Sequence, residues 1–134
     1  MPFRSRALAA SLVSASILVA LPSQAADPAL GRGGGCFPAN DWQGWASPSP
    51  TVIYIRVLLN DVYRLDLSAG SWRLQDPAVH LVNRVRGAAW ICGPLDFDLE
   101  LADDQGVMRQ GLIVKSMQRL TSDEVKAIPA KFRP

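Results

Sequence analysis

Histidine is nearly absent from this chain of 134 residues, since His80 is the only one. A zinc site normally takes several ligands from cysteine and histidine, and a Ser-His-Asp triad would have to use this single histidine. No serine stands in a G-x-S-x-G nucleophile elbow. We therefore expect no metal centre, no cofactor and no serine hydrolase site, and we expect His80 to be a satisfied or half-buried core residue.

A surplus of positive charge is also lacking beyond the first 25 residues. The formal net charge of +2 comes from Arg4 and Arg6, and the rest of the chain carries twelve basic and twelve acidic side chains. Nucleic acids are bound largely through clustered lysine and arginine. The six arginines from Arg32 to Arg86 are scattered among acids, so we expect no nucleic-acid partner.

Long hydrophobic runs are missing after the N-terminal stretch. Residues 7–21 hold no charge, follow the basic Arg4 and Arg6, and precede small residues at Ser23 and Ala25. This pattern predicts a signal peptide over residues 1–25, cleaved between Ala25 and Ala26. The alternative is a membrane anchor, but a spanning helix needs roughly 20 apolar residues. We expect a soluble mature chain, periplasmic or secreted, with no membrane span.

Cysteine occurs twice, at Cys36 and Cys92. In an exported protein such a pair favours a structural disulfide, and closing this long loop stabilises a fold by ~4 kcal/mol in the chain-entropy model. A reactive thiol or two unpaired buried thiols are the alternatives. No cation adjoins Cys92 in the sequence to lower its thiol pKa.

The β-strand signals begin at residue 51. Residues 51–59 and 62–67 are rich in β-branched and aromatic side chains and flank Asn60 and Asp61, which predicts a hairpin. We expect a weak strand at 79–82 and a regularly alternating one at 95–101. The residues expected to face the core are Ile53, Ile55, Val57, Tyr63, Leu65, Leu67, Leu95, Phe97, Leu99 and Leu101.

The C-terminal third predicts a turn at 103–106, a strand within 107–120 centred on Leu112, Ile113 and Val114, and a short helix. Thr121 and Glu124 form a capping box, and Pro129 ends the helix. Residues 26–50 are loop-like, and residues 26–35 of them form a flexible leader. The predicted fold is α+β and mainly antiparallel β: one domain over 36–134, a five- or six-stranded sheet or half-open barrel with a short C-terminal helix.

Two groups of side chains are candidates for function. Asp96, Asp98 and Glu100 alternate along the predicted strand, where carboxylates on one face bind a hard cation or serve as acid and base. The solvent face of an amphipathic strand explains them equally well. Trp42 and Trp45 lie in the loop-like region and are candidate ligand contacts, and packing is their alternative role.

A set of residues spread over most of 36–134 forms a familiar pattern: Cys36, 62–67, 87–92, Asp96, 119–125, Ile128, Pro129, Arg133 and Pro134. In these residues the chain resembles the domain-of-unknown-function family 6491 of exported proteobacterial proteins. The resemblance implies an exported α+β domain and no known activity. Members of this family often carry four cysteines, and the two missing here would fall near Ser71 and Gly111. Loss of one complete disulfide would remove both of these cysteines together. The resemblance therefore implies that the remaining two, Cys36 and Cys92, form a disulfide with each other.

No motif commits the chain to a reaction, so we expect a non-enzymatic domain that binds a protein, a peptide or an envelope component. One alternative is a small metal-dependent hydrolase that uses Asp96, Asp98 and Glu100. The other is a structural or stress-protective envelope protein without a ligand.

Overall fold

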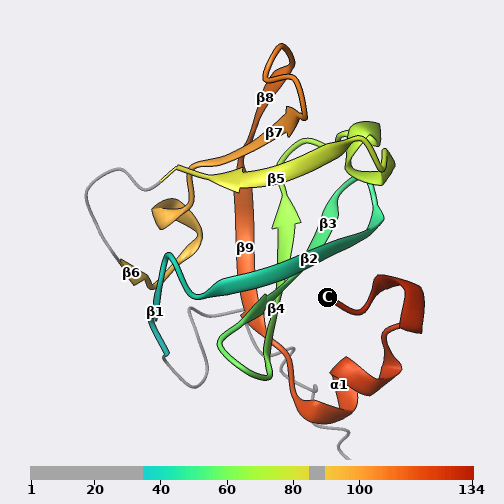
Figure 1. Cartoon of the computed structure of the whole chain (residues 1–134). Helices are drawn as coiled ribbons and strands as arrows, with labels where there is room; N and C mark the ends of the chain where they lie inside the picture. Colours follow the sequence, from blue (N-terminus) through green and yellow to red (C-terminus); the bar gives the residue numbers. More distant parts are fainter. Residues whose placement is uncertain (1–34, 85–89) are drawn as a thin grey trace, which may run out of the picture.

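The computed structural model describes residues 35–84 and 90–134, which form a mainly antiparallel β fold with one short α-helix (Figure 1). Its strands are β1 (Phe37–Pro38), β2 (Trp42–Ser49), β3 (Val52–Val57), β4 (Asp61–Leu67), β5 (Val79–Asn83), β6 (Trp90–Ile91), β7 (Leu99–Asp103), β8 (Arg109–Leu112) and β9 (Val114–Arg119). Its helical elements are the 3-10 turns η1 (Trp72–Gln75), η2 (Pro94–Asp96) and η3 (Ala130–Phe132) and the helix α1 (Ser122–Ala127). The predicted fold class is confirmed.

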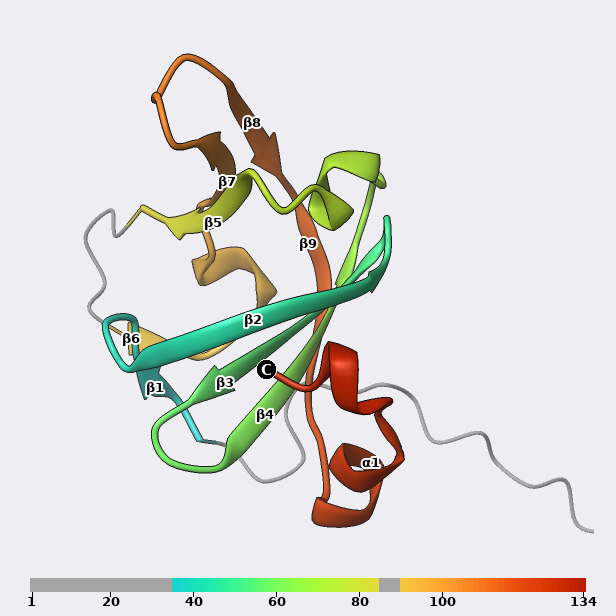
Figure 2. The ribbon, with the colours of Figure 1, turned by 45° about the vertical axis from the view of Figure 1, so that its right-hand side comes forward.

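The strands belong to three sheets rather than to a single sheet of five or six strands. Their orders are β2-β3-β4-β9, β5-β7-β8 and β1-β6. Only Ile113 separates β8 from β9, so the chain passes directly from the three-stranded sheet to the four-stranded one. Over the described residues, the two larger sheets therefore form a half-open barrel whose unpaired edges are β2 and β5, which lie on the same side in Figures 1 and 2.

The predicted hairpin is confirmed as β3 and β4, with Leu58 to Asn60 as its turn. All six side chains predicted to face inward from this hairpin are buried. They share one core with residues from every other sheet, including Phe37, Leu81, Ile91, Leu99 and Leu101. The weak strand predicted at 79–82 is confirmed as β5.

The loop-like interpretation of residues 26–50 is wrong where the structure describes it, since β2 occupies residues 42–49. The strand pairs with β3 through two irregularities, between Trp42 and Gly44 and between Ala46 and Ser49. Each irregularity shifts the side-chain alternation, so the sequence pattern of β2 has no period of two. The signal peptide and residues 26–34 of the predicted leader at 26–35 lie outside the described residues.

Two strand predictions in the C-terminal half need correction. Residues 95–101 are not one strand, because Pro94–Asp96 forms η2 and leaves Leu95 94% exposed, and β7 begins only at Leu99. Residues 107–120 contain two strands in different sheets, and Ile113 between them is exposed. Pro94 favours the 3-10 turn because its ring fixes φ near the helical value.

The C-terminal helix is confirmed with its capping box. The Glu124 amide donates to Thr121 Oγ1 at 3.3 Å and the Thr121 amide donates to Glu124 Oε2 at 2.7 Å. Ile128, directly after α1, is buried, whereas Val125 is half-buried. Figure 2 shows α1 beside the lower part of β4 and β9. Within the described ranges, no helix is both long and apolar enough to cross a membrane.

Candidate functional site

The open side of the barrel holds a shallow pocket between β2 and β5. No ladder joins these two strands in the described part of the chain. The pocket has a volume of about 290 Å³, and its lining residues are Ala39, Trp42, Leu81, Val82 and Asn83. We call this pocket, together with the facing edges of β2 and β5, the slot.

Two segments of the chain lie next to the β2 wall of the slot. At one end, η1 is bound to β2, because Gln75 Nε2 donates to the Pro48 carbonyl at 3.3 Å. At the other end, β1 leads into the Ala39 wall and pairs with β6. Short segments therefore flank the slot, which is an open, shallow depression between two strand edges.

The tryptophans occupy different positions from those predicted. Trp42 and Trp45 lie in β2, are half-buried and pack against the core, so they are not loop residues. Trp42 also lines the slot, which keeps it as a candidate ligand contact, whereas Trp45 is not among the lining residues. The exposed tryptophans are Trp72 and Trp90, at 67% and 54%.

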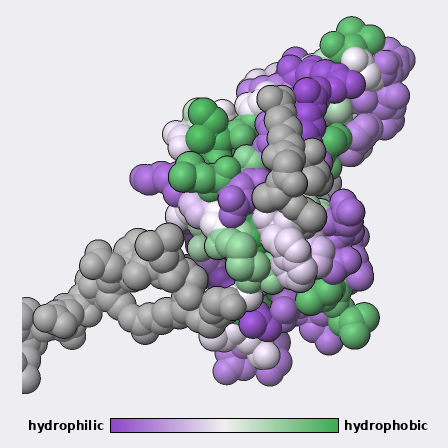
Figure 3. All heavy atoms as spheres, turned by 90° about the vertical axis from the view of Figure 1, so that its left-hand side faces the viewer, coloured by the Kyte–Doolittle hydropathy of each residue, from purple (hydrophilic) through white to green (hydrophobic). Residues whose placement is uncertain are grey.

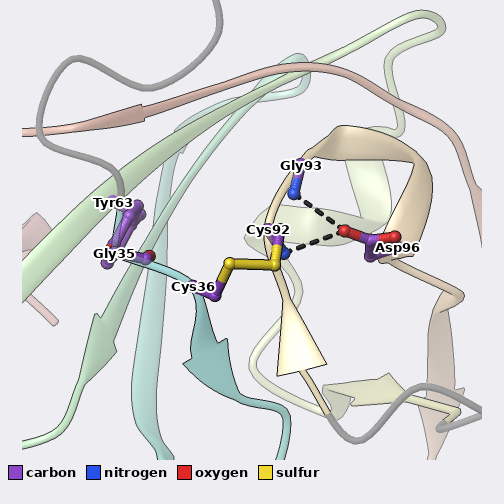
Figure 4. The surroundings of a disulfide bond; sticks show 6 residues. All are labelled: Gly35, Cys36, Tyr63, Cys92, Gly93 and Asp96. Carbon is purple, nitrogen blue, oxygen red and sulfur yellow. Dashed lines mark hydrogen bonds between the residues drawn. A yellow bond between two sulfur atoms is a disulfide. The ribbon is translucent and has the colours of Figure 1, made fainter.

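The predicted disulfide between Cys36 and Cys92 is present and joins the two strands of the small sheet (Figure 4). Phe37 and Ile91 lie opposite each other in this sheet and are both buried in the core. Cys36 and Cys92 themselves are exposed. The disulfide therefore connects β1 and β6 at the protein surface, while the inner side chains of the same two strands pack in the core.

Two further contacts hold the chain on each side of the bridge. The Asp96 carboxylate accepts hydrogen bonds from the amides of Cys92 and Gly93 at 2.8 and 2.9 Å. On the other side, the Tyr63 hydroxyl donates to the Gly35 carbonyl at 3.2 Å. Burial raises the pKa of Tyr63, and the nearby Arg119 opposes that shift. This phenol therefore stays protonated and serves as a donor.

The structure does not bring the three candidate carboxylates together on one strand face. Asp96 lies in η2, Asp98 precedes β7, and only Glu100 is within a strand. Glu100, 13% exposed, binds Arg84 and Arg109 at 2.9 and 3.0 Å. The prediction of a shared face is wrong, because η2 turns the chain before β7 begins.

A metal-dependent enzyme would need a cluster of metal-ligating side chains, and the part of the chain that the structure describes contains none. There, no group of three or more histidine, cysteine, aspartate or glutamate side chains is placed to hold a metal ion. His80 is exposed on the outer side of β5, with Nδ1 at 3.3 Å from Asp104 Oδ1. The prediction of a core position for His80 is wrong, because Val79 and Leu81 are the inward residues of this strand.

Exposed apolar side chains are dispersed over the surface. The large ones are Leu58, Leu59, Trp72, Val82, Trp90, Leu95, Val107 and Ile113. Figure 3 shows the face at the left-hand side of Figure 1, where hydrophobic groups among the coloured residues are separated by hydrophilic ones. Sequence reasoning missed the slot itself, since its walls come from segments about 40 residues apart.

Comparison with known proteins found no relative of this chain. No family model, no curated protein and no solved structure matches the chain.

Proposed function

We propose that this protein is exported, loses residues 1–25 by cleavage between Ala25 and Ala26, and acts outside the cytoplasm as a non-enzymatic binding domain. The N-terminal sequence supports export. The Cys36–Cys92 disulfide is consistent with an oxidising compartment, because such bonds persist there. Membership of the domain-of-unknown-function family 6491 remains part of this proposal.

The observation that carries the proposal is the slot. It combines a half-buried tryptophan, Trp42, with an edge of β5 that no described strand covers. Binding sites in proteins are typically concave and mostly apolar, with a few polar groups that fix orientation. The partner of the slot is a protein or a peptide.

The hydrolase alternative receives less support from the geometry. Glu100 is held by two arginines, and Asp96 accepts two backbone hydrogen bonds. A catalytic pair of carboxylates must flank the same scissile bond of the substrate. Carboxylates engaged in separate structural contacts do not offer that arrangement.

Selection of random decapeptides on the exported protein, with its disulfide intact, tests the proposal. We expect enriched peptides with dissociation constants below about 1 mM. Val82→Lys places a charge at the rim of the slot and should weaken them at least tenfold. The matched control is Val107→Lys, which lies 82% exposed in the β7–β8 turn and should change nothing.

Two results would contradict binding at the slot. One is a selection that enriches no peptide, which would favour a structural envelope protein without a ligand. The other is equal weakening by Val82→Lys and Val107→Lys, which would place the binding surface elsewhere. Circular dichroism of both variants confirms that each is folded.

A further inference from the structure

The ladder between β5 and β7 determines which backbone groups of β5 are free. The Arg84 amide donates to the Asp98 carbonyl at 2.9 Å, which marks these residues as a hydrogen-bonded pair. Such pairs alternate with non-hydrogen-bonded ones along an antiparallel ladder. Leu81 and Asn83 fall at non-hydrogen-bonded positions. Their N–H and C=O groups therefore point away from β7, and no described backbone group bonds to them.

The edge of β5 lacks the features that keep other edges from pairing. Natural edge strands are protected by proline, by charged side chains or by bulges. The opposite edge, β2, contains Pro48 and two irregularities in its register. Residues 79–83 contain no proline and no lysine, arginine or carboxylate, and they pair with β7 without a register shift.

The slot beside this edge has an uncharged lining. Its five lining residues carry no ionised side chain, and Trp42, Leu81 and Val82 supply its apolar surface. The lining exposes polar as well as apolar atoms, and it disfavours a charged side chain of a ligand. In a strand, every second side chain points to the same face. A ligand strand along β5 would therefore direct alternate residues into the pocket.

From these observations we propose that the ligand of the slot is an extended peptide segment of a partner protein, which adds as a further strand to the free edge of β5. This inference rests on the proposed function and specifies the class of ligand. Backbone hydrogen bonds to Leu81 and Asn83 would provide affinity, and the pocket at Trp42 would select an uncharged side chain. Since β5 has five residues, the contact needs only a short segment.

Amide hydrogen exchange, measured by NMR on the exported protein with and without an enriched decapeptide, tests this mode of binding. In the free protein, we expect the Leu81 and Asn83 amides to exchange at least tenfold faster than those of His80 and Val82. The peptide should slow exchange at Leu81 and Asn83 at least tenfold. Peptides methylated on alternate backbone nitrogens supply a second measurement, since one set should lose binding and the other should retain it.

The outcomes separate this inference from the proposed function. A peptide that is weakened by Val82→Lys but leaves the Leu81 and Asn83 amides unprotected would overturn strand addition and keep binding at the slot. Protection of these amides in the free protein would also overturn it. If such protection depends on concentration, a second copy occupies the edge, and if it does not, another segment of this chain does.

Discussion

At the scale of single residues, the acidic side chains near β7 have separate structural tasks. Asp96 fastens the backbone at Cys92 and Gly93, whereas Glu100 neutralises Arg84 and Arg109. A carboxylate that is 13% exposed has lost much of its hydration, and the two guanidinium groups compensate for that loss. These carboxylates stabilise the fold, and they are not arranged for acid and base catalysis.

Replacement of Glu100 tests this assignment. Glu100→Gln leaves the Arg84 and Arg109 guanidinium groups without their shared carboxylate, so we expect the free energy of unfolding to fall by ~1–3 kcal/mol. The control is Asp104→Asn, whose side chain is 82% exposed and which should change stability by less than ~0.5 kcal/mol. Urea denaturation measures both.

Calorimetric titration with calcium, magnesium and zinc completes this test. We expect no binding below about 1 mM by the unsubstituted protein. A metal that binds more tightly and is lost in Glu100→Gln would restore the hydrolase alternative.

At the scale of elements, α1 is too short to be stable alone, so its end contacts decide whether it forms. The capping box satisfies amide groups at its start, and Arg133 Nη2 donates to the carbonyls of Lys126 and Ile128 at 3.0 and 2.8 Å. The buried Ile128 then fixes the helix to the rest of the molecule. Both ends of α1 are therefore held by specific contacts.

The capping box makes α1 sensitive to acid. Hydrogen bonds from the Thr121 backbone amide, and then from its hydroxyl, lower the pKa of Glu124 below its ordinary value of 4.5. A carboxylate whose pKa is depressed by folding stabilises the fold above the ordinary value and loses this contribution as the pH falls through the lowered pKa. We therefore expect α1 to fray progressively once the pH falls below that ordinary value, measured by amide exchange in the helix.

Two variants separate the charge of Glu124 from the cap itself. Glu124→Gln should remove the acid dependence of α1, because the amide does not titrate in this range. Thr121→Ala removes the cap and should cost ~1 kcal/mol at neutral pH. Acid fraying that persists in Glu124→Gln would assign it to another carboxylate.

At the scale of the whole molecule, the Cys36–Cys92 bridge connects β1 and β6 at one end of the barrel. The small sheet has only two residue pairs, Phe37 with Ile91 and Pro38 with Trp90. Proline has no amide hydrogen to donate, so backbone bonding in this sheet is weak. The bridge and the buried Phe37 and Ile91 are the main connections at this end of the barrel.

Removal of the bridge tests its contribution to the molecule. The cysteines are 56 positions apart, so in the chain-entropy model Cys36→Ser with Cys92→Ser should lower the free energy of unfolding by ~4 kcal/mol. Urea denaturation of the oxidised protein with and without reductant should give a similar difference. A difference below about 1 kcal/mol would show that Phe37 and Ile91 hold this end without the bridge.

Local sequence patterns determined the elements whose side chains alternate without interruption and the helix with its capping signals. The hairpin at 51–67, its six inward residues and α1 were predictable because adjacent residues decide these features. The compartment predicted from the N-terminal residues also made a Cys36–Cys92 bridge the favoured pairing. That bridge is present in the structure.

Only the tertiary structure decided the rest. In β2, register irregularities break the alternation of side chains, so the sequence pattern does not reveal the strand. At residues 94–96 the sequence alternates like a strand, but hydrogen bonds to Asp96 hold the chain in a turn. The slot depends on which strands remain unpaired, and the β2 and β5 edges meet only after the barrel has formed. Contacts between distant segments follow from closure of the whole chain, which a pattern of neighbouring residues does not encode.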